Sequence, residues 1–422
     1  MEEDIKNTSF KVEKNKIAEE RLTKAIEEAE SILAFEAAHN IELIQALDIV
    51  KEYISKKKLI CYGGTAMNAL LPKKDKFYDP EYDLPDYDFF TYDVKTAVKE
   101  LVHTLKMAGF KNIHEKMGIH EGTKKILVNY VAIADITEIH KDNFKILYEN
   151  SKNVGGIYYA NQDVLRMMMF LELSRPRGEV ERWKKVFERL QLLNKYFPVK
   201  ACKKKHQKKK IPLDIRQILY NYILDNQRVV ANIELEALYN KALTDDVTFN
   251  TTIEGGNIIF YSPDLKKDAT DLKMLLPDVS IFYYAEKGDF LANRIALKYK
   301  GKQIVLIIQE TGCHSHNNIK TERGQTIRIA SLETLITLHY SLYYFSNSEK
   351  TFLCNIGQCL KTYMALAISP KTTLNAFSVL CSGYQKGYPT LLREKLLRVK
   401  RLKRTAKSSR TTRKNSTLKK DV

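Results

Sequence analysis

Apolar residues recur at helical spacing through the first part of the chain. Ile17, Leu22 and Ile26 lie on one face of a helix that the pattern predicts over about residues 13–35. The same spacing predicts a second helix over about residues 41–55. The chain therefore begins with a helical segment rather than with a strand.

The pattern changes at residues 59–62, a short apolar run that Gly63 and Gly64 follow at once. Such a run predicts a strand that ends in a tight turn, and residues 65–71 then predict a short helix. Further strands are predicted at 86–91, 125–137, 257–262, 279–284, 293–300 and 303–310, and further helices at 94–108, 164–173, 179–195, 213–240, 331–345, 350–367 and 391–402. Both parts of the chain mix strands and helices, which predicts the α+β class.

Charge and composition divide this pattern into domains. The chain has 69 Lys and Arg against 51 Asp and Glu, a net charge of +18. Seven lysines and no acid lie in residues 200–210, and 13 basic residues with two acids lie in 393–422, so these two segments account for the whole excess. We predict the following division: an N-terminal helical segment at 1–57, a first α/β domain at 58–199, a Lys-rich linker at 200–212, a second α/β domain at 213–392 and a flexible basic tail at 393–422. Concentrated positive charge on a neutral body is typical of a protein that binds a polyanion, with nucleic acid favoured.

Other bulk features point to the cytoplasm. No run of 18 apolar residues is present, so we expect no membrane span, and the acidic start of the chain is unlike a secretory signal. The six cysteines are scattered over 422 residues and predict reduced thiols rather than a disulfide framework. Cys313, His314 and His316 have the types of a zinc site, but with no second pair nearby they favour a polar hairpin tip.

Two carboxylates one residue apart carry the most specific chemistry. Asp86 and Asp88 lie in a predicted strand, where residues two apart project to the same face. Like charges so close repel unless cations lie between them, and oxygen ligands of this kind suit Mg²⁺ or Mn²⁺. Asp135 lies in a buried apolar strand, where an acid is costly without a metal or a partner. The three acids predict a metal site.

The glycine turn predicts a place for phosphates. Gly63 and Gly64 let backbone amides approach an anion, the start of the following helix favours negative charge, and Thr65 adds a hydroxyl. A triphosphate between this turn and a three-carboxylate cluster describes two-metal nucleotidyl transfer. Three further basic residues are weaker candidates for contacts with RNA or phosphate: Arg166, Lys184 and Lys185.

Several segments resemble viral poly(A) polymerases of large cytoplasmic DNA viruses. The likeness to their catalytic core lies in KKKLICYGGTAMNALL, DLPDYDFFTYD and VAIADIT, and likeness to later parts lies in LRMMMFLELSRP…RWKKVFERLQLLNKYFP and NIIFYSPDLKKDATDL. It covers about residues 40–390. The resemblance implies two nucleotidyltransferase-like halves of the polymerase β type, the first active and the second degenerate. It also implies that Asp86, Asp88 and Asp135 are the metal ligands, and that Gly63 and Gly64 hold the triphosphate.

Together with the motifs, this resemblance implies an enzyme that adds AMP from ATP to mRNA 3′ ends without a template and releases pyrophosphate. Two Mg²⁺ or Mn²⁺ ions would serve it, in the cytoplasm of a host cell or in a virion, with RNA and ATP as partners and a homodimer or a processivity partner in addition. Two alternatives stay open from the residues alone. One is a transferase with another nucleotide or acceptor, and the other is an inactive RNA-binding scaffold.

Overall fold

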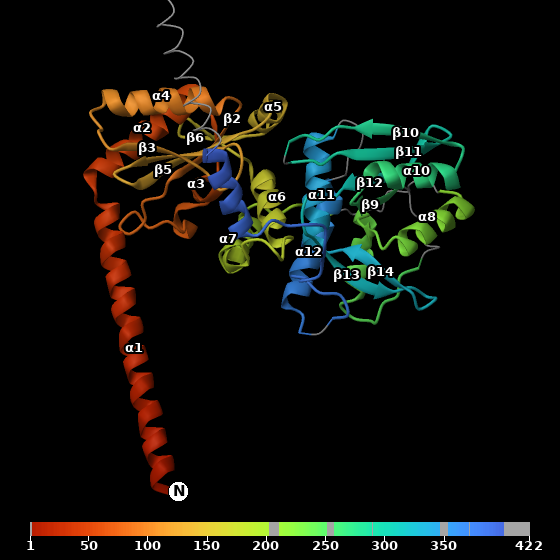
Figure 1. The fold of residues 1–422 in the computed structure, drawn as a ribbon, viewed down its shortest axis with the longest axis horizontal. Coiled ribbons are helices and arrows are strands. Elements are labelled where there is room, and N and C mark those ends of the chain that lie inside the picture. The colour runs from red at the N-terminus through yellow and green to blue at the C-terminus, as the bar shows by residue number, and fades with distance from the viewer. Residues whose placement is uncertain are drawn as a thin grey trace, which may run out of the picture. The chain divides into compact units, whose positions relative to one another are not determined.

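The computed structural model describes residues 2–201, 211–250, 257–288, 290–346, 353–370 and 372–400, with side chains from residue 15 onward. The chain forms two compact units (Figure 1). Unit 1 comprises Met1–Lys116, Thr123–Thr137 and Asn153–Tyr159, and unit 2 comprises Met117–Gly122, Glu138–Lys152 and Ala160–Val422. The predicted tail beyond residue 400 and most of the Lys-rich linker lie outside the described residues.

Unit 1 is built on a mixed sheet with the strand order β3-β4-β5-β2-β1-β7-β6. Its strands are β1 (Ile60–Tyr62), β2 (Tyr87–Thr91), β3 (Ile113–Met117), β4 (Thr123–Val128), β5 (Val131–Glu138), β6 (Lys152–Val154) and β7 (Ile157–Tyr159). Its helices are α1 (Glu2–Ala38), α2 (Ile41–Lys57), α3 (Gly63–Leu70) and α4 (Val94–Met107), with a 3-10 turn η1 (Lys73–Asp75). The predicted helical start of the chain is confirmed, and α1 is longer than its apolar spacing indicated.

Local signals explain where these helices begin and end. The Asn40 side chain accepts a hydrogen bond from the backbone N–H of Leu43, and Asp93 caps α4 in the same way through Thr96. Lys58 ends α2 in the left-handed conformation, at φ 53°. Leu43, Leu47, Val50 and Ile54 of α2 are buried, so this helix supplies apolar packing to unit 1.

Unit 2 holds a second sheet with the order β10-β11-β12-β9-β8-β14-β13-β15. Its strands are β8 (Val229–Val230), β9 (Ile258–Ser262), β10 (Val279–Tyr284), β11 (Arg294–Tyr299), β12 (Lys302–Gln309), β13 (His314–Lys320), β14 (Thr326–Ala330) and β15 (Cys381–Ser382). Its helices are α5 (Lys141–Glu149), α6 (Gln162–Leu173), α7 (Trp183–Tyr196), α8 (Leu213–Asp225), α9 (Glu236–Lys241), α10 (Leu265–Leu275), α11 (Leu332–Phe345) and α12 (Leu353–Ile368), with 3-10 turns η2 (Val180–Arg182) and η3 (Ile233–Leu235); residues 388–400 are also helical. Most of α11 is buried, and this helix packs against both α6 and α12.

The second sheet repeats the strand order of the first. The series β4-β5-β2-β1-β7 corresponds to β11-β12-β9-β8-β14. In both series the two short central strands pair antiparallel, β1 with β2 and β8 with β9, and the next pair is parallel, β1 with β7 and β8 with β14. The strands at the other end, β4 with β5 and β11 with β12, are antiparallel in both. The predicted α+β fold with two related halves is confirmed.

Two predicted elements are wrong in a way that matters for this repeat. The helix expected over 213–240 ends at Asp225, because Gln227 takes a left-handed conformation at φ 52° and the β-branched pair Val229-Val230 enters the sheet as β8. The long strand expected over 125–137 is a hairpin, turned by Asn129 and Tyr130 at φ 49° and 68°.

The domain division drawn from charge differs from the compact units, since residues 160–199 cluster with unit 2. The predicted domain at 58–199 spans this division. Residues 202–210 are outside the described part of the chain, so the Lys-rich linker at 200–212 stays a prediction. Among the described helices, none is both long enough and apolar enough to cross a membrane.

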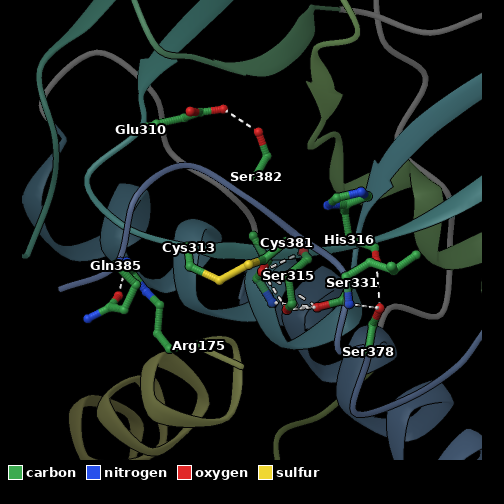
Figure 2. The surroundings of a disulfide bond; sticks show 12 residues. Arg175, Glu310, Cys313, Ser315, His316, Ser331, Ser378, Cys381, Ser382 and Gln385 are labelled. Atoms are coloured by element: carbon green, nitrogen blue, oxygen red, sulfur yellow. Dashed lines mark hydrogen bonds between the residues drawn. A yellow bond between two sulfur atoms is a disulfide. The ribbon is translucent and has the colours of Figure 1, made fainter. Parts of the chain in front are cut away.

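The prediction of reduced thiols is wrong for Cys313, Cys354 and Cys381, which are disulfide-bonded, whereas Cys61 and Cys359 are free. Cys313 and Cys381 form a disulfide in unit 2, although 68 positions separate them in sequence (Figure 2). The antiparallel pairing of β13 with β15, which places Ser315 opposite Cys381, brings the two segments together. His314 and His316 are buried in β13 and not at a hairpin tip. Because disulfides persist mainly in oxidising compartments, cysteine usage does not support the cytoplasmic location, which stays a prediction.

Candidate active site

The turn between β1 and α3 places a glycine directly against a carboxylate. Gly63 has φ +71°, and a Cβ added there would lie 2.3 Å from Oδ2 of Asp88. A side chain at this position would therefore strain the backbone and displace the carboxylate. The close approach explains why a glycine follows β1, and it leaves the Asp88 carboxylate beside the first turn of α3.

Asp88 lies in β2 and Asp86 directly before it, so the strand predicted at 86–91 is confirmed one residue shorter. Asp88 pairs with Tyr62 across the β1–β2 ladder, and Asp86 directly precedes β2. The Thr65 hydroxyl donates a hydrogen bond to the backbone carbonyl oxygen of Asp86 at 2.8 Å. The Thr65 hydrogen bond thus connects α3 to the segment that carries both acids. The sequence did not predict this structural role for Thr65.

Asp135 lies on β5, the strand that neighbours β2. It faces Lys125 of β4 in the antiparallel register, and the Lys125 ammonium donates to Oδ2 of Asp135. The Asp135 side chain is 15% exposed, and its other oxygen, Oδ1, is buried with no hydrogen-bond partner. The Tyr62 hydroxyl and the Thr137 hydroxyl are 2.9 Å apart, which links β1 to β5 across β2. One carboxylate oxygen of Asp135 is thus held by the Lys125 ammonium, and the other has no hydrogen-bond partner among the described residues.

The acids share one negative region. Burial raises the pKa of Asp86 above its ordinary value, the charge of Asp135 raises it further, and Lys125 acts in the opposite direction. Burial raises the pKa of Cys61 well above its ordinary value, with the charges of Asp88 and Asp86 next in importance. Concentrated negative charge of this kind is typical of a site that binds a cation.

The donor set fits a divalent metal, although the described side chains do not already form a three-ligand group around one point. Carboxylate oxygens are what Mg²⁺ and Mn²⁺ prefer. The unpartnered Oδ1 of Asp135, the raised pKa of Asp86 and the close approach of Gly63 to Asp88 all match residues that would hold a divalent cation. Lys125 contacts one oxygen of Asp135, a residue that would also bind the metal. The sequence analysis did not identify this lysine. Recognition of the Asn129–Tyr130 turn would have predicted this cross-strand pair.

One consequence for stability follows from Asp86. Because its folded-state pKa is raised, its contribution to stability is complete below the ordinary aspartate pKa and is lost as pH rises through the raised value. Asp86→Asn is therefore expected to raise the melting temperature of the metal-free protein by a few degrees at neutral pH. Thermal unfolding measured from pH 3 to 8 checks this: the difference from wild type should vanish at the acidic end, and a variant less stable at neutral pH would contradict it.

The second unit lacks the acids at the corresponding positions. In the first sheet the last residue of β1, Tyr62, pairs with Asp88. In the second sheet the last residue of β8, Val230, pairs with Phe260, and the residue two before it is Ile258. Both replacements are buried and apolar. Among the described residues, unit 2 therefore offers no counterpart to the acidic pair on β2.

The weaker candidates lie elsewhere. Arg166 is fully buried in unit 2, where it donates to Asp163 at 2.5 Å, to Asn194 at 2.8 Å and to the Phe197 carbonyl oxygen at 2.5 Å. Its donors are engaged in packing α6 against α7, so we do not include it in the site. Lys184 and Lys185 are exposed on α7, and their contacts with RNA stay a prediction.

The repeated sheet, the glycine turn and the acids on β2 and β5 define a nucleotidyltransferase-like fold. Residues 48–179 match the family model described as "Poly(A) polymerase catalytic subunit". The chain is similar to the crystal structure of the Megavirus polyadenylate synthase, with a TM-score of 0.74 and 19% identity over 92% of this chain and 84% of that one. The resemblance predicted from the motifs is confirmed.

Curated relatives carry the same description. A putative poly(A) polymerase catalytic subunit of African swine fever virus (isolate Tick/South Africa/Pretoriuskop Pr4/1996) is 30% identical over 188 residues, which are 43% of this chain and 39% of that protein. The corresponding protein of Acanthamoeba polyphaga mimivirus is 25% identical over 350 residues, 74% of this chain and 59% of that protein. The match to the African swine fever virus protein thus spans about two fifths of its length.

Proposed function

We propose that this chain is a polynucleotide adenylyltransferase, which adds AMP from ATP to RNA 3′ ends without a template and releases pyrophosphate. The observation that carries the proposal is the contact between the glycine turn and the carboxylate beside it. Gly63 lies directly against Asp88, so a turn that would bind phosphate adjoins a carboxylate that would bind metal, and both lie inside the 48–179 segment that matches the poly(A) polymerase family model. This combination favours nucleotidyl transfer over the inactive scaffold.

Each residue has a defined role in this proposal. Asp86, Asp88 and Asp135 would hold two Mg²⁺ or Mn²⁺ ions, which when bound supply charge stabilisation for the attacking 3′ oxygen and the departing pyrophosphate. Gly63 and Gly64 would let the backbone approach the triphosphate, with the start of α3 favouring its negative charge. The hydrogen bond from Thr65 to Asp86 keeps the turn and the acids in register. The Asp135 carboxylate would then contact both the Lys125 ammonium and a bound metal ion.

Incorporation of labelled nucleotides tests the proposal. The full chain is incubated with an RNA oligonucleotide, Mg²⁺ or Mn²⁺ and one of ATP, CTP, GTP or UTP, and products are resolved by length. The proposal predicts a ladder of added residues with ATP and far less with the others. A preference for UTP, or a ladder formed only on another acceptor, would establish the transferase alternative. Retained RNA binding with no incorporation of any nucleotide would establish the scaffold and contradict the proposal.

We also keep the predicted homodimer as a proposal, which α1 supports (Figure 1). Apolar side chains along this helix are exposed to solvent, with Leu22 at 62% and Ile26 at 48%. Exposed apolar stripes on a long helix are typical of helix–helix association. Light scattering on Leu22→Glu/Ile26→Glu should show a monomer where wild type shows a dimer, and the polar control Lys24→Glu should stay dimeric. A monomeric wild type would contradict the homodimer.

A further inference from the structure

An arginine in unit 2 is partly buried and, among the described residues, has no acidic partner. Arg175 follows the end of α6, and its Nη1 donates to Oε1 of Gln385 at 3.2 Å. Its Nε is buried and has no hydrogen-bond partner within the described residues. In the described part of the chain no carboxylate pairs with this guanidinium. Glu172 pairs with Arg182 at 3.1 Å, and Glu310 accepts from the Ser382 hydroxyl at 2.7 Å.

The cost of withdrawing part of this guanidinium from water is only partly compensated. The side chain remains charged in proteins, so it cannot avoid the cost of burial by releasing a proton. Removal of such a charge from water costs several kcal/mol unless an opposite charge or hydrogen bonds compensate. One neutral amide, that of Gln385, supplies only part of this compensation. The remaining donor requires an acceptor.

The surroundings hold the Arg175 head group in a fixed place. A Cβ on Gly312 would lie 1.3 Å from Nη1 of Arg175, so the guanidinium lies directly on this glycine. The segment that carries Gln385 packs equally closely, since a Cβ on Gly383 would lie 2.1 Å from the Gly312 carbonyl oxygen. The Cys313–Cys381 disulfide joins the two segments beside this point (Figure 2). The position of the donor is thus set by the fold and not by a flexible side chain alone.

Arg175 borders a cavity of about 50 Å³ in unit 2. This volume exceeds the roughly 10–15 Å³ that one water requires, so the cavity takes several waters or one small ion. Ser174, Thr311 and Thr337 are among the residues that line it, and the buried Thr337 hydroxyl has no hydrogen-bond partner in the described part of the chain. Burial and the charge of Arg175 hold the pKa of His314, also in the wall, well below its ordinary value, so its imidazole is neutral.

We infer that unit 2 carries a binding site for a small phosphate-type oxoanion, held by Arg175 and the Thr337 hydroxyl in the cavity between the end of α6, the end of β12 and α11. The planar guanidinium matches a tetrahedral oxoanion, and the hydroxyl adds a second donor. Tyr261 of the wall follows Phe260 on β9, so its side chain projects to the face of the strand opposite to Ile258 and Phe260. The site therefore lies on the other face of this strand from the positions that correspond to Asp86 and Asp88.

Calorimetric titration of the full chain with inorganic phosphate, at ionic strength held constant with chloride, tests this site. Wild type should bind one equivalent saturably, and Arg175→Gln should weaken the affinity at least tenfold. Arg177→Gln removes the same charge from an exposed residue two positions along, and it should bind within twofold of wild type. A parallel titration with ribose 5-phosphate identifies the source: tighter binding than inorganic phosphate indicates a phosphate ester, and weaker binding indicates the free ion.

A second variant keeps the test decisive if Arg175→Gln folds poorly. Gly312→Ala places a methyl group where the guanidinium lies, so the flexible arginine must move while the backbone stays. We expect phosphate affinity to fall at least tenfold in this variant too. Equal binding by wild type, Arg175→Gln and Gly312→Ala would overturn the proposal. No saturable binding to wild type would also overturn it, since the cavity would then hold water only.

Discussion

The Asp86→Asn/Asp88→Asn double variant is expected to lose AMP incorporation by roughly 10³-fold or more. The two carboxylates are the proposed metal ligands on β2, and metal ions supply several kcal/mol of charge stabilisation to reactions of this class, at about 1.4 kcal/mol for each factor of ten. Asparagine keeps the size of each side chain but removes both charges. Initial rates of ATP incorporation onto one RNA oligonucleotide at saturating substrate measure the loss.

The control for this variant lies in the same neighbourhood. Asp93→Asn replaces an exposed acid whose side chain caps α4, and asparagine caps helices about as well. It should retain wild-type incorporation. RNA affinity of the double variant should stay near wild type, because the predicted RNA contacts are basic residues elsewhere. Full activity in the double variant would remove these acids from the mechanism.

The second large effect is expected from Gly63→Ala. The new methyl group would lie 2.3 Å from Oδ2 of Asp88, and the backbone would be strained at φ +71°. Asp88 must therefore move, and displacement of a catalytic group by about 1 Å costs on the order of 100-fold in rate. We expect incorporation to fall by about that factor, together with a lower affinity for Mn²⁺ measured by titration.

Gly109→Ala separates backbone strain from displacement. Gly109 also has a positive φ, +96°, yet a Cβ there meets no atom within 4 Å. It should lose stability comparable to Gly63→Ala, by about 1 kcal/mol, with incorporation unchanged. An equal loss of activity in both variants would show that strain, and not the position of Asp88, determines the effect.

Local sequence rules predicted the parts of the site that are themselves local. The side chains of Asp86 and Asp88 are one strand repeat apart, and the glycine turn follows an apolar run, so spacing alone placed them. The ion pair between Lys125 and Asp135 depends on a hairpin register, and a strand read as continuous over 125–137 could not show it. The register between two strands depends on the turn that joins them. The sequence indicates only weakly which residues of such a turn adopt a positive φ.

In the second unit too, the sequence predicted local features but not contacts between segments far apart in the chain. Its apolar strands and the absence of an acidic pair were predicted, and the buried Ile258 and Phe260 agree with a degenerate half. The Cys313–Cys381 disulfide and the burial of Arg166 were missed, because each depends on packing between segments far apart in sequence. A basic residue on a helix looks the same in sequence whether it faces solvent or an aspartate in the core.

The most direct test of a single catalytic site in the first unit is the position of bound Mn²⁺. Crystals of the full chain soaked with Mn²⁺ and a non-hydrolysable ATP analogue would be measured at an energy where manganese scatters anomalously. The account predicts anomalous peaks within coordination distance of Asp86 and Asp88, with the triphosphate beside Gly63 and no manganese bound in unit 2. Manganese and triphosphate bound in unit 2, with none at Asp86, would contradict it.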